Sequence, residues 1–385
     1  MIYMDNAATT RLSDKALDAM IPFMTEIYAN PAAGYGFAEK ARKAVEISRK
    51  QIADCIHAAP EEVFFTSGGT ESDNWALRGA AYANQAKGRH LIISAIEHHA
   101  VLNTARALEK EGWELTILPV DAEGLVDPKT VEKAIRPDTV LISVMAANNE
   151  IGTIEPVTEI GEIAHRHGVL FHTDAVQAFG HIPLDVLHID LLSASAHKFH
   201  GPKGVGFLYI RKGTFPDPLL YGGGQERGMR SGTLNVPGIV GTGAAAAEAV
   251  KSMTGNVERD YMISRILSEI PGSKLTGPAV HRLPNHASFV FDGIDGESLL
   301  QMLNAKGVCA SAGSACSAGS EEPSHVLQAI GIPKSLVHNS LRLTISGETT
   351  HQEAETVVNS VKSIVENLRT GTHDRQRPVF YWREK

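Results

Sequence analysis

The chain has 385 residues, a length that suggests two domains or one large domain with an appendage. Hydrophobic residues make up 43% of it, and the net charge of −8 with no long basic run argues against nucleic acid or an anionic membrane surface as partners. Three cysteines, no secretion signal and no apolar run of the ~20 residues that span a membrane predict a cytoplasmic protein with reduced thiols.

Short apolar strands alternate with amphipathic helices along the first two thirds of the chain. Residues 36–57 carry apolar side chains at helical spacing, with charged residues opposite. Further helices are expected at 71–86, 99–110, 127–136 and 157–168, and strands at 63–66, 91–94, 115–118, 140–144 and 169–172. This alternation predicts an α/β fold with a mainly parallel central sheet flanked by helices.

The sequence changes in character near Pro237. From there on we expect helices at 243–252, 256–270 and 350–368, and strands near 287–292 and 340–345. This pattern predicts a smaller α+β domain. We therefore expect a large domain over 15–250 and a small domain formed by 1–14 together with 251–385.

Two polar residues follow apolar runs in the first part of the chain. Asp174 follows a buried-strand pattern that begins at Val169, and Lys198 comes just after the apolar run 190–194. In a parallel sheet, sites gather at the carboxyl ends of strands. A lysine that forms a Schiff base with an aldehyde and a carboxylate that keeps a pyridine nitrogen protonated are what pyridoxal phosphate (PLP) chemistry needs.

The segment 66–72, with sequence TSGGTES, joins an expected strand directly to an expected helix. Its glycines allow close backbone approach, and the free N–H groups of a helix start favour a dianion. The Thr70 hydroxyl adds a donor. An ordinary helix cap is the alternative; with Lys198 and Asp174 on the same sheet, a phosphate site is the better interpretation.

Two further side chains follow strands. The imidazole of His98 could stack on a pyridine ring and move protons, and Asn149 could hydrogen-bond a ring hydroxyl. The alternatives are a capping or solvent-exposed histidine and a turn asparagine. The histidines of 197–200 lack an accompanying acid or cysteine cluster, so we expect no metal site.

Small residues make up nearly all of the segment 310–320, which has Cys316 near its centre. Such a segment buries too little apolar area to pack firmly, which predicts a mobile loop with an exposed, reactive thiol. Cys316 is therefore the candidate nucleophile, and an incidental loop thiol is the alternative. Cys55, on the apolar side of a helix, is expected in the core, and Cys309 is expected to be structural.

Arg342 lies in an expected strand of apolar and hydroxyl side chains, where a guanidinium usually has a protein or ligand partner. The donor-rich segment 222–233 is expected to be flexible. It lacks the strand context of a dinucleotide-binding fingerprint, and the chain contains no P-loop pattern.

Taken together, these motifs resemble the cysteine desulfurases, PLP enzymes of fold type I in the class V aminotransferase group. The similar branch serves iron–sulfur cluster and nitrogenase cofactor assembly. The resemblance runs from Tyr3 to about Thr349. Its most specific pieces are 66–74, 148–152, 174–177, 195–198, 226–233 and 314–316 with 322–324.

The resemblance implies roles for individual residues. Lys198 would be the Schiff-base lysine, His98 would stack on the ring, and Cys316 would carry a persulfide and transiently contact a cluster. Arg342 and Asn149 would bind the substrate, with Arg342 on its carboxylate. The resemblance also implies Asp174 at the ring nitrogen, and Asn149 and Gln177 at the ring hydroxyl. Gly69, Thr70, Ser195 and His197 would bind the phosphate, and Thr233 would reach the phosphate from the other subunit of the dimer.

The resemblance thus implies a homodimer that converts L-cysteine to L-alanine and passes sulfur to an acceptor or scaffold protein. Selenocysteine lyase, cysteine sulfinate desulfinase or transaminase activity, and a purely non-enzymatic sulfur-transfer role, are the alternatives. The chain departs from the family at 32–35, where Ala-Ala-Gly-Tyr replaces the usual serines and histidine, and at 378–385, which differs from the usual scaffold-docking tail.

Overall fold

The computed structural model describes residues 1–253, 257–313 and 323–371. Its largest sheet has seven strands in the order β2-β8-β7-β6-β5-β3-β4. The strands are β2 (Val63–Thr66), β3 (His90–Ser94), β4 (Glu114–Leu118), β5 (Thr139–Ser143), β6 (Leu170–Asp174), β7 (Leu191–Ser195) and β8 (Gly206–Ile210). Neighbouring strands from β7 to β4 pair in parallel, while β8 is antiparallel to both β7 and β2. The expected α/β class and mainly parallel sheet are confirmed.

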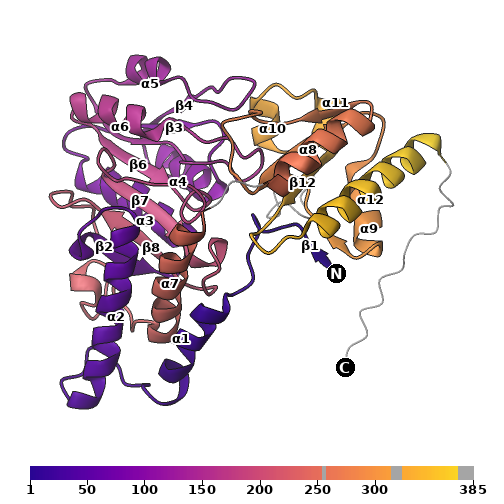
Figure 1. Ribbon diagram of the computed structural model, residues 1–385. Coiled ribbons are helices and arrows are strands. Elements are labelled where there is room, and N and C mark those ends of the chain that lie inside the picture. Colours follow the sequence, from indigo (N-terminus) through magenta and orange to yellow (C-terminus); the bar gives the residue numbers. More distant parts are fainter. Residues whose placement is uncertain (254–256, 314–322, 372–385) are drawn as a thin grey trace.

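Helices cover both faces of this sheet (Figure 1). They are α1 (Asp14–Thr25), α2 (Gly36–Cys55), α3 (Gly69–Ala83), α4 (His99–Lys110), α5 (Pro128–Ala134), α6 (Val157–Arg166) and α7 (Val236–Ala249), with short 3-10 turns η1 (Pro60–Glu62), η2 (Ala196–Lys198), η3 (Glu226–Gly228) and η4 (Val250–Ser252). Successive strand residues point to opposite faces. Ile92 therefore belongs to the same hydrophobic cluster as residues of α2 and α7, whereas Leu91 and Ile93 belong to the cluster that includes residues of α3 and α4.

The remaining elements form a smaller α+β part, on the right of Figure 1. They are β9 (Ser273–Leu275), β10 (His286–Phe291), β11 (Val308–Cys309), β12 (Ser340–Thr344), α8 (Val257–Glu269), α9 (Gly296–Ala305), α10 (His325–Ala329), α11 (Lys334–Val337) and α12 (His351–Thr370). The strands β12, β10 and β9 form an antiparallel sheet, and the N-terminal β1 (Ile2–Tyr3) pairs with β11 before the chain crosses to α1.

The expected two-domain division stays a prediction; three hydrophobic clusters support it, while a fourth joins Ile96, Met145 and Ile151 to residues between 290 and 337. One cluster joins Met4 to apolar residues between Met262 and Val365, apart from the two clusters on the large sheet. The expected boundary at 250 falls just after α7 ends at Ala249. Among the described residues, no helix has the length and apolar character to cross a membrane.

Several elements differ from the sequence expectations, among them α1, α9 and the two described next. The helix expected at 243–252 begins at Val236, because Asn235 accepts a hydrogen bond from the Gly238 N–H at 3.1 Å and Pro237 fits a first helical turn. The strand β8 was not expected. It returns antiparallel between β2 and β7, an arrangement that depends on strand pairing rather than on local sequence.

Candidate active site

The lysine and the acid predicted to act together lie at the carboxyl ends of neighbouring strands. Asp174 ends β6, and Lys198 lies in the turn η2 directly after β7, which pairs in parallel with β6. The Lys198 Nζ donates to the carbonyl oxygens of Ala7 at 2.5 Å and Ala8 at 2.9 Å. The N-terminal segment, which the sequence analysis assigned to the small domain, therefore binds this amine.

Asp174 is only 3% exposed, and its Oδ1 accepts a hydrogen bond from the Val176 N–H at 2.8 Å. Burial raises the pKa of its carboxyl to about 6, against the opposing effects of the Val176 bond and the Lys198 charge. A buried acid on the floor of a site is suited to pairing with a cation such as a protonated ring nitrogen.

Asp73, on α3, is a buried neighbour that sequence reasoning missed. Burial, and then the charge of Asp174, raise the pKa of Asp73 well above its ordinary value. Its Oδ1 has no hydrogen-bond partner within residues 1–253, 257–313 and 323–371, and lies 3.7 Å from His172 Nε2. Because two buried carboxylates so close repel each other, Asp73 is the one that keeps its proton.

His98 is the N-cap of α4, and its Nδ1 accepts the Ala100 N–H at 3.1 Å. Burial, followed by the nearby Lys198 charge, lowers the pKa of His98 to about 4, so the ring is neutral near pH 7 with its proton on Nε2. One ligand atom each from His98, Asp73 and Asp174 lie within 4.8 Å of one another. The raised pKa values of both acids oppose the ionised ligands that a metal prefers, and the absence of a metal site stays a prediction.

The turn before α3 forms a cradle of backbone. Gly68 has a φ of +153°, and no side chain caps the helix. A Cβ on Gly69 would lie 2.7 Å from a methyl group of Val176, and one on Gly68 would lie 3.6 Å from Ser195 Oγ. The predicted phosphate residues of α3 and β7 therefore meet, and uncapped N–H groups with a glycine backbone fit a phosphate group.

Gln177, His197 and Thr233 are the other residues predicted to contact the cofactor. Gln177 Nε2 donates to Ala7 O at 2.8 Å, the same oxygen that Lys198 contacts. A ring nitrogen of His197 lies 3.1 Å from Thr9 Oγ1, and burial, followed by nearby lysine charges, lowers its pKa to about 4. Thr233 is exposed on the segment between η3 and α7, as a contact to a partner subunit would require.

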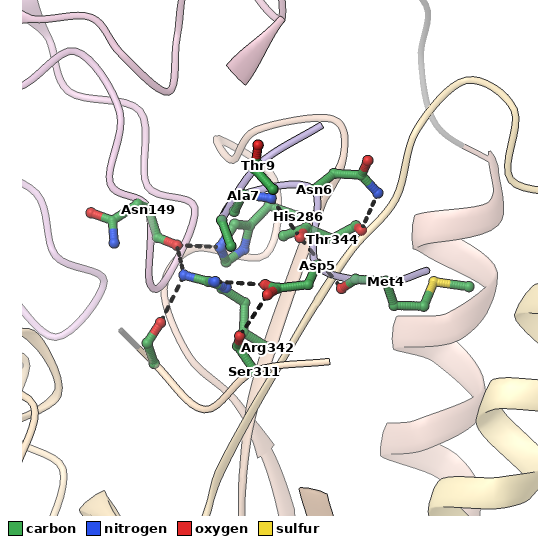
Figure 2. A network of polar contacts seen from close by, with 12 residues as sticks. Met4, Asp5, Asn6, Ala7, Thr9, Asn149, His286, Ser311, Arg342 and Thr344 are labelled. Atoms are coloured by element: carbon green, nitrogen blue, oxygen red, sulfur yellow. Dashed lines mark hydrogen bonds and ion pairs between the residues drawn. The ribbon is translucent and has the colours of Figure 1, made fainter. Parts of the chain in front are cut away.

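Arg342 is 1% exposed and already paired (Figure 2). Its guanidinium donates to Asp5 Oδ1 at 2.8 Å and to the carbonyl oxygens of Asn149 at 2.9 Å and Gly313 at 2.8 Å. The Asn149 side chain points away from this network. Arg342 Nε has no partner in the described part of the chain, which leaves one buried donor for an added acceptor.

The structure describes two of the three cysteines, Cys55 and Cys309. Cys55 packs against the core, and burial raises its thiol pKa to about 11, as expected of an unreactive thiol. Cys309 is half-buried in β11. Cys316 lies outside the described residues, so its predicted mobility and exposure stay predictions.

Glu97 is a second buried acid that sequence reasoning missed. The Ser94 hydroxyl and the Met145 N–H donate to its Oε1 at 2.6 and 2.9 Å, and Oε2 lacks a partner among the described residues. Burial raises the pKa of Glu97 to about 8. Neighbouring sequence positions gave no signal for it, because its burial depends on β5 packing beside β3.

We expect Glu97→Gln to stabilise the cofactor-free protein increasingly as pH rises. A folded-state pKa above the unfolded value means that the stability from Glu97 is complete below 4.5 and lost as pH rises through about 8. The gap in unfolding free energy between variant and wild type should widen by about 1 kcal/mol per pH unit in that window. Urea unfolding at several pH values measures it; a gap that stays constant would contradict the raised pKa.

The sequence of this chain is similar to those of known proteins over most of its length. The family model described as aminotransferase class-V matches residues 2–357. The chain is 52% identical over 375 residues to cysteine desulfurase IscS of Methanosarcina thermophila, covering 96% of this chain and 93% of that protein. It is 50% identical over 376 residues to the protein of the same name from Dictyoglomus turgidum, covering 96% and 95%.

Solved structures show the same similarity. A NifS-like protein, 38% identical, superposes with a TM-score of 0.90 over 95% of this chain and 100% of that chain. A structure described as SspA in complex with cysteine, also 38% identical, superposes with a TM-score of 0.81 over 90% and 99%.

Proposed function

Because the chain belongs to the class V aminotransferase family, we propose that it is a PLP-dependent cysteine desulfurase. It would convert L-cysteine and a protein thiol into L-alanine and a protein persulfide. The observation that carries this proposal is the placement of Lys198 and Asp174 at the ends of paired strands, beside the cradle at Gly68 and Gly69. The activity after which these relatives are named supports it.

The residues present fit PLP. Asp174 would pair with the ring nitrogen, His98 would cover the ring, and the uncapped start of α3 with Ser195 would hold the phosphate. Bound there, PLP supplies an aldehyde that links to amines and a ring that accepts electrons from the substrate.

The chain's own groups would handle protons and sulfur. The Lys198 amine would remove and return protons beside the substrate nitrogen. His98 carries its proton on Nε2 and its Nδ1 accepts the Ala100 N–H, so the predicted transfer of the substrate thiol proton to His98 would require that bond to break. The Cys316 thiolate would then attack the substrate sulfur, forming an S–S bond as the carbon–sulfur bond breaks and leaves its electron pair on carbon. Arg342 Nε is the donor that we assign to the substrate carboxylate.

We also propose a homodimer that supplies sulfur for iron–sulfur or related cofactors. Exposed apolar side chains on one face of α1, namely Leu17, Ile21 and Met24, continue to Tyr28, whose ring stacks edge-on with Phe37 at 5.3 Å. A patch of this kind supports an interface with another protein chain. The assignment of the dimer partner to a second copy of this chain, and of the sulfur to an acceptor protein, rests on the resemblance. The cytoplasmic location rests on the three cysteines and the composition.

The test of the function is an assay of the purified full chain with PLP, L-cysteine and a thiol reductant. We expect alanine and sulfide in equal amounts, because each turnover moves one sulfur atom. Alanine formed only when a keto acid is added would indicate a transaminase instead. No alanine under any of these conditions would support the non-enzymatic alternative.

A further inference from the structure

An acidic residue lies on the turn proposed to hold the phosphate. Glu71 comes directly after Gly69 and Thr70, and its Oε2 accepts the Ser67 N–H at 2.9 Å, so the carboxylate folds back over the turn. Arg230 binds both carboxylate oxygens of Glu71: its Nε donates to Oε1 at 2.7 Å and its Nη2 donates to Oε2 at 3.0 Å. Both side chains are largely buried, with 12% of Glu71 and 17% of Arg230 exposed.

The Glu71 carboxylate would repel a phosphate group bound at this turn. Burial would raise the pKa of Glu71, but hydrogen bonds from Arg230 and Ser67 hold it below its ordinary value, so Glu71 is ionised at neutral pH. A fixed negative charge one or two residues from a bound dianion repels it, and the effect is strong in a partly buried site. The guanidinium of Arg230 cancels that charge.

A second buried ion pair involves Glu226, in the same segment as Arg230. Arg49 donates to both carboxylate oxygens of Glu226 at 2.8 Å, and the Phe65 N–H donates to Glu226 at 2.8 Å. Glu226 and Arg227 are held in the left-handed region, with φ of 48° and 58°. A strained backbone persists only where its surroundings over-determine it, and the contacts of Glu226 supply that support, while the expected flexibility of 222–233 stays a prediction.

We propose that Arg230 is a positioning residue that makes the turn at 67–71 compatible with the cofactor phosphate by neutralising Glu71. The inference rests on the proposed function, because it takes the phosphate of PLP to bind at this turn. It concerns a residue distant in sequence from the phosphate contacts that the resemblance implies on α3 and β7.

The test compares the affinities of the cofactor-free protein for PLP and for pyridoxal, which lacks the phosphate, by absorbance titration. We expect Arg230→Met to weaken PLP binding by about tenfold or more, since it leaves Glu71 unpaired beside the dianion. Glu71→Gln should bind PLP as tightly as the wild type or more tightly. The double variant should return to within about threefold of the wild type, since neither charge remains.

Two controls separate charge balance from general damage. None of these variants should alter the affinity for pyridoxal. Arg78 also lies on α3, and Arg78→Met breaks its ion pair with Glu111; this variant should not alter the affinity for PLP. A double variant as weak as Arg230→Met, or equal losses for PLP and pyridoxal, would overturn the proposal. A wild-type protein that binds neither ligand would instead refute the proposed function.

Discussion

Replacing Lys198 by alanine is expected to reduce alanine formation from L-cysteine by roughly 10³-fold or more, because one amine both anchors the cofactor and moves protons at the substrate. In the structure its Nζ is held by the Ala7 and Ala8 carbonyl oxygens, at the end of the strand beside Asp174. Alanine assays under saturating PLP measure the loss.

Two variants sharpen this experiment. Lys198→Arg keeps a positive charge but cannot give up its proton, so it should be nearly as inactive as the alanine variant. Lys203→Ala removes an exposed lysine five residues on and should retain wild-type activity. If Lys198→Ala kept more than about a tenth of the activity, the assignment of this lysine would be wrong.

Replacing Cys316 by alanine should abolish sulfide release from L-cysteine while the absorbance of bound PLP stays unchanged. The reason is that this thiol receives the sulfur but holds no part of the cofactor. Cys55→Ala and Cys309→Ala are the matched controls, since the first thiol is held protonated by burial and the second lies in β11. Both should release sulfide at close to the wild-type rate.

The same variant distinguishes the rival activities. Release of selenium from selenocysteine, or of sulfite from cysteine sulfinate, needs no attacking thiol and should survive the loss of Cys316. Full sulfide release from L-cysteine by Cys316→Ala would remove the persulfide step from the mechanism. That result would leave the roles of Lys198 and Asp174 intact.

The sequence alone predicted the main strands and helices of the large sheet and the positions of two candidate site residues. Buried-strand runs, helical stripes and the glycine turn at Gly68 and Gly69 are local patterns, and they located the ends of β6 and β7 where Asp174 and Lys198 lie. The predicted fold type I architecture is confirmed by similarity to solved NifS-like structures. The predicted roles of individual residues stay predictions for the experiments above.

Tertiary structure decided what surrounds each of these groups. The contacts of Asp5 with Arg342, and of Ala7 with Lys198, join residues 337 and 191 positions apart. The neighbours of Asp174 include Asp73, which lies on a helix a hundred residues earlier. Hydrophobic periodicity is set by adjacent residues, whereas charge balance and proton affinity depend on which strands and helices pack together, and that order is fixed only when the whole chain has folded.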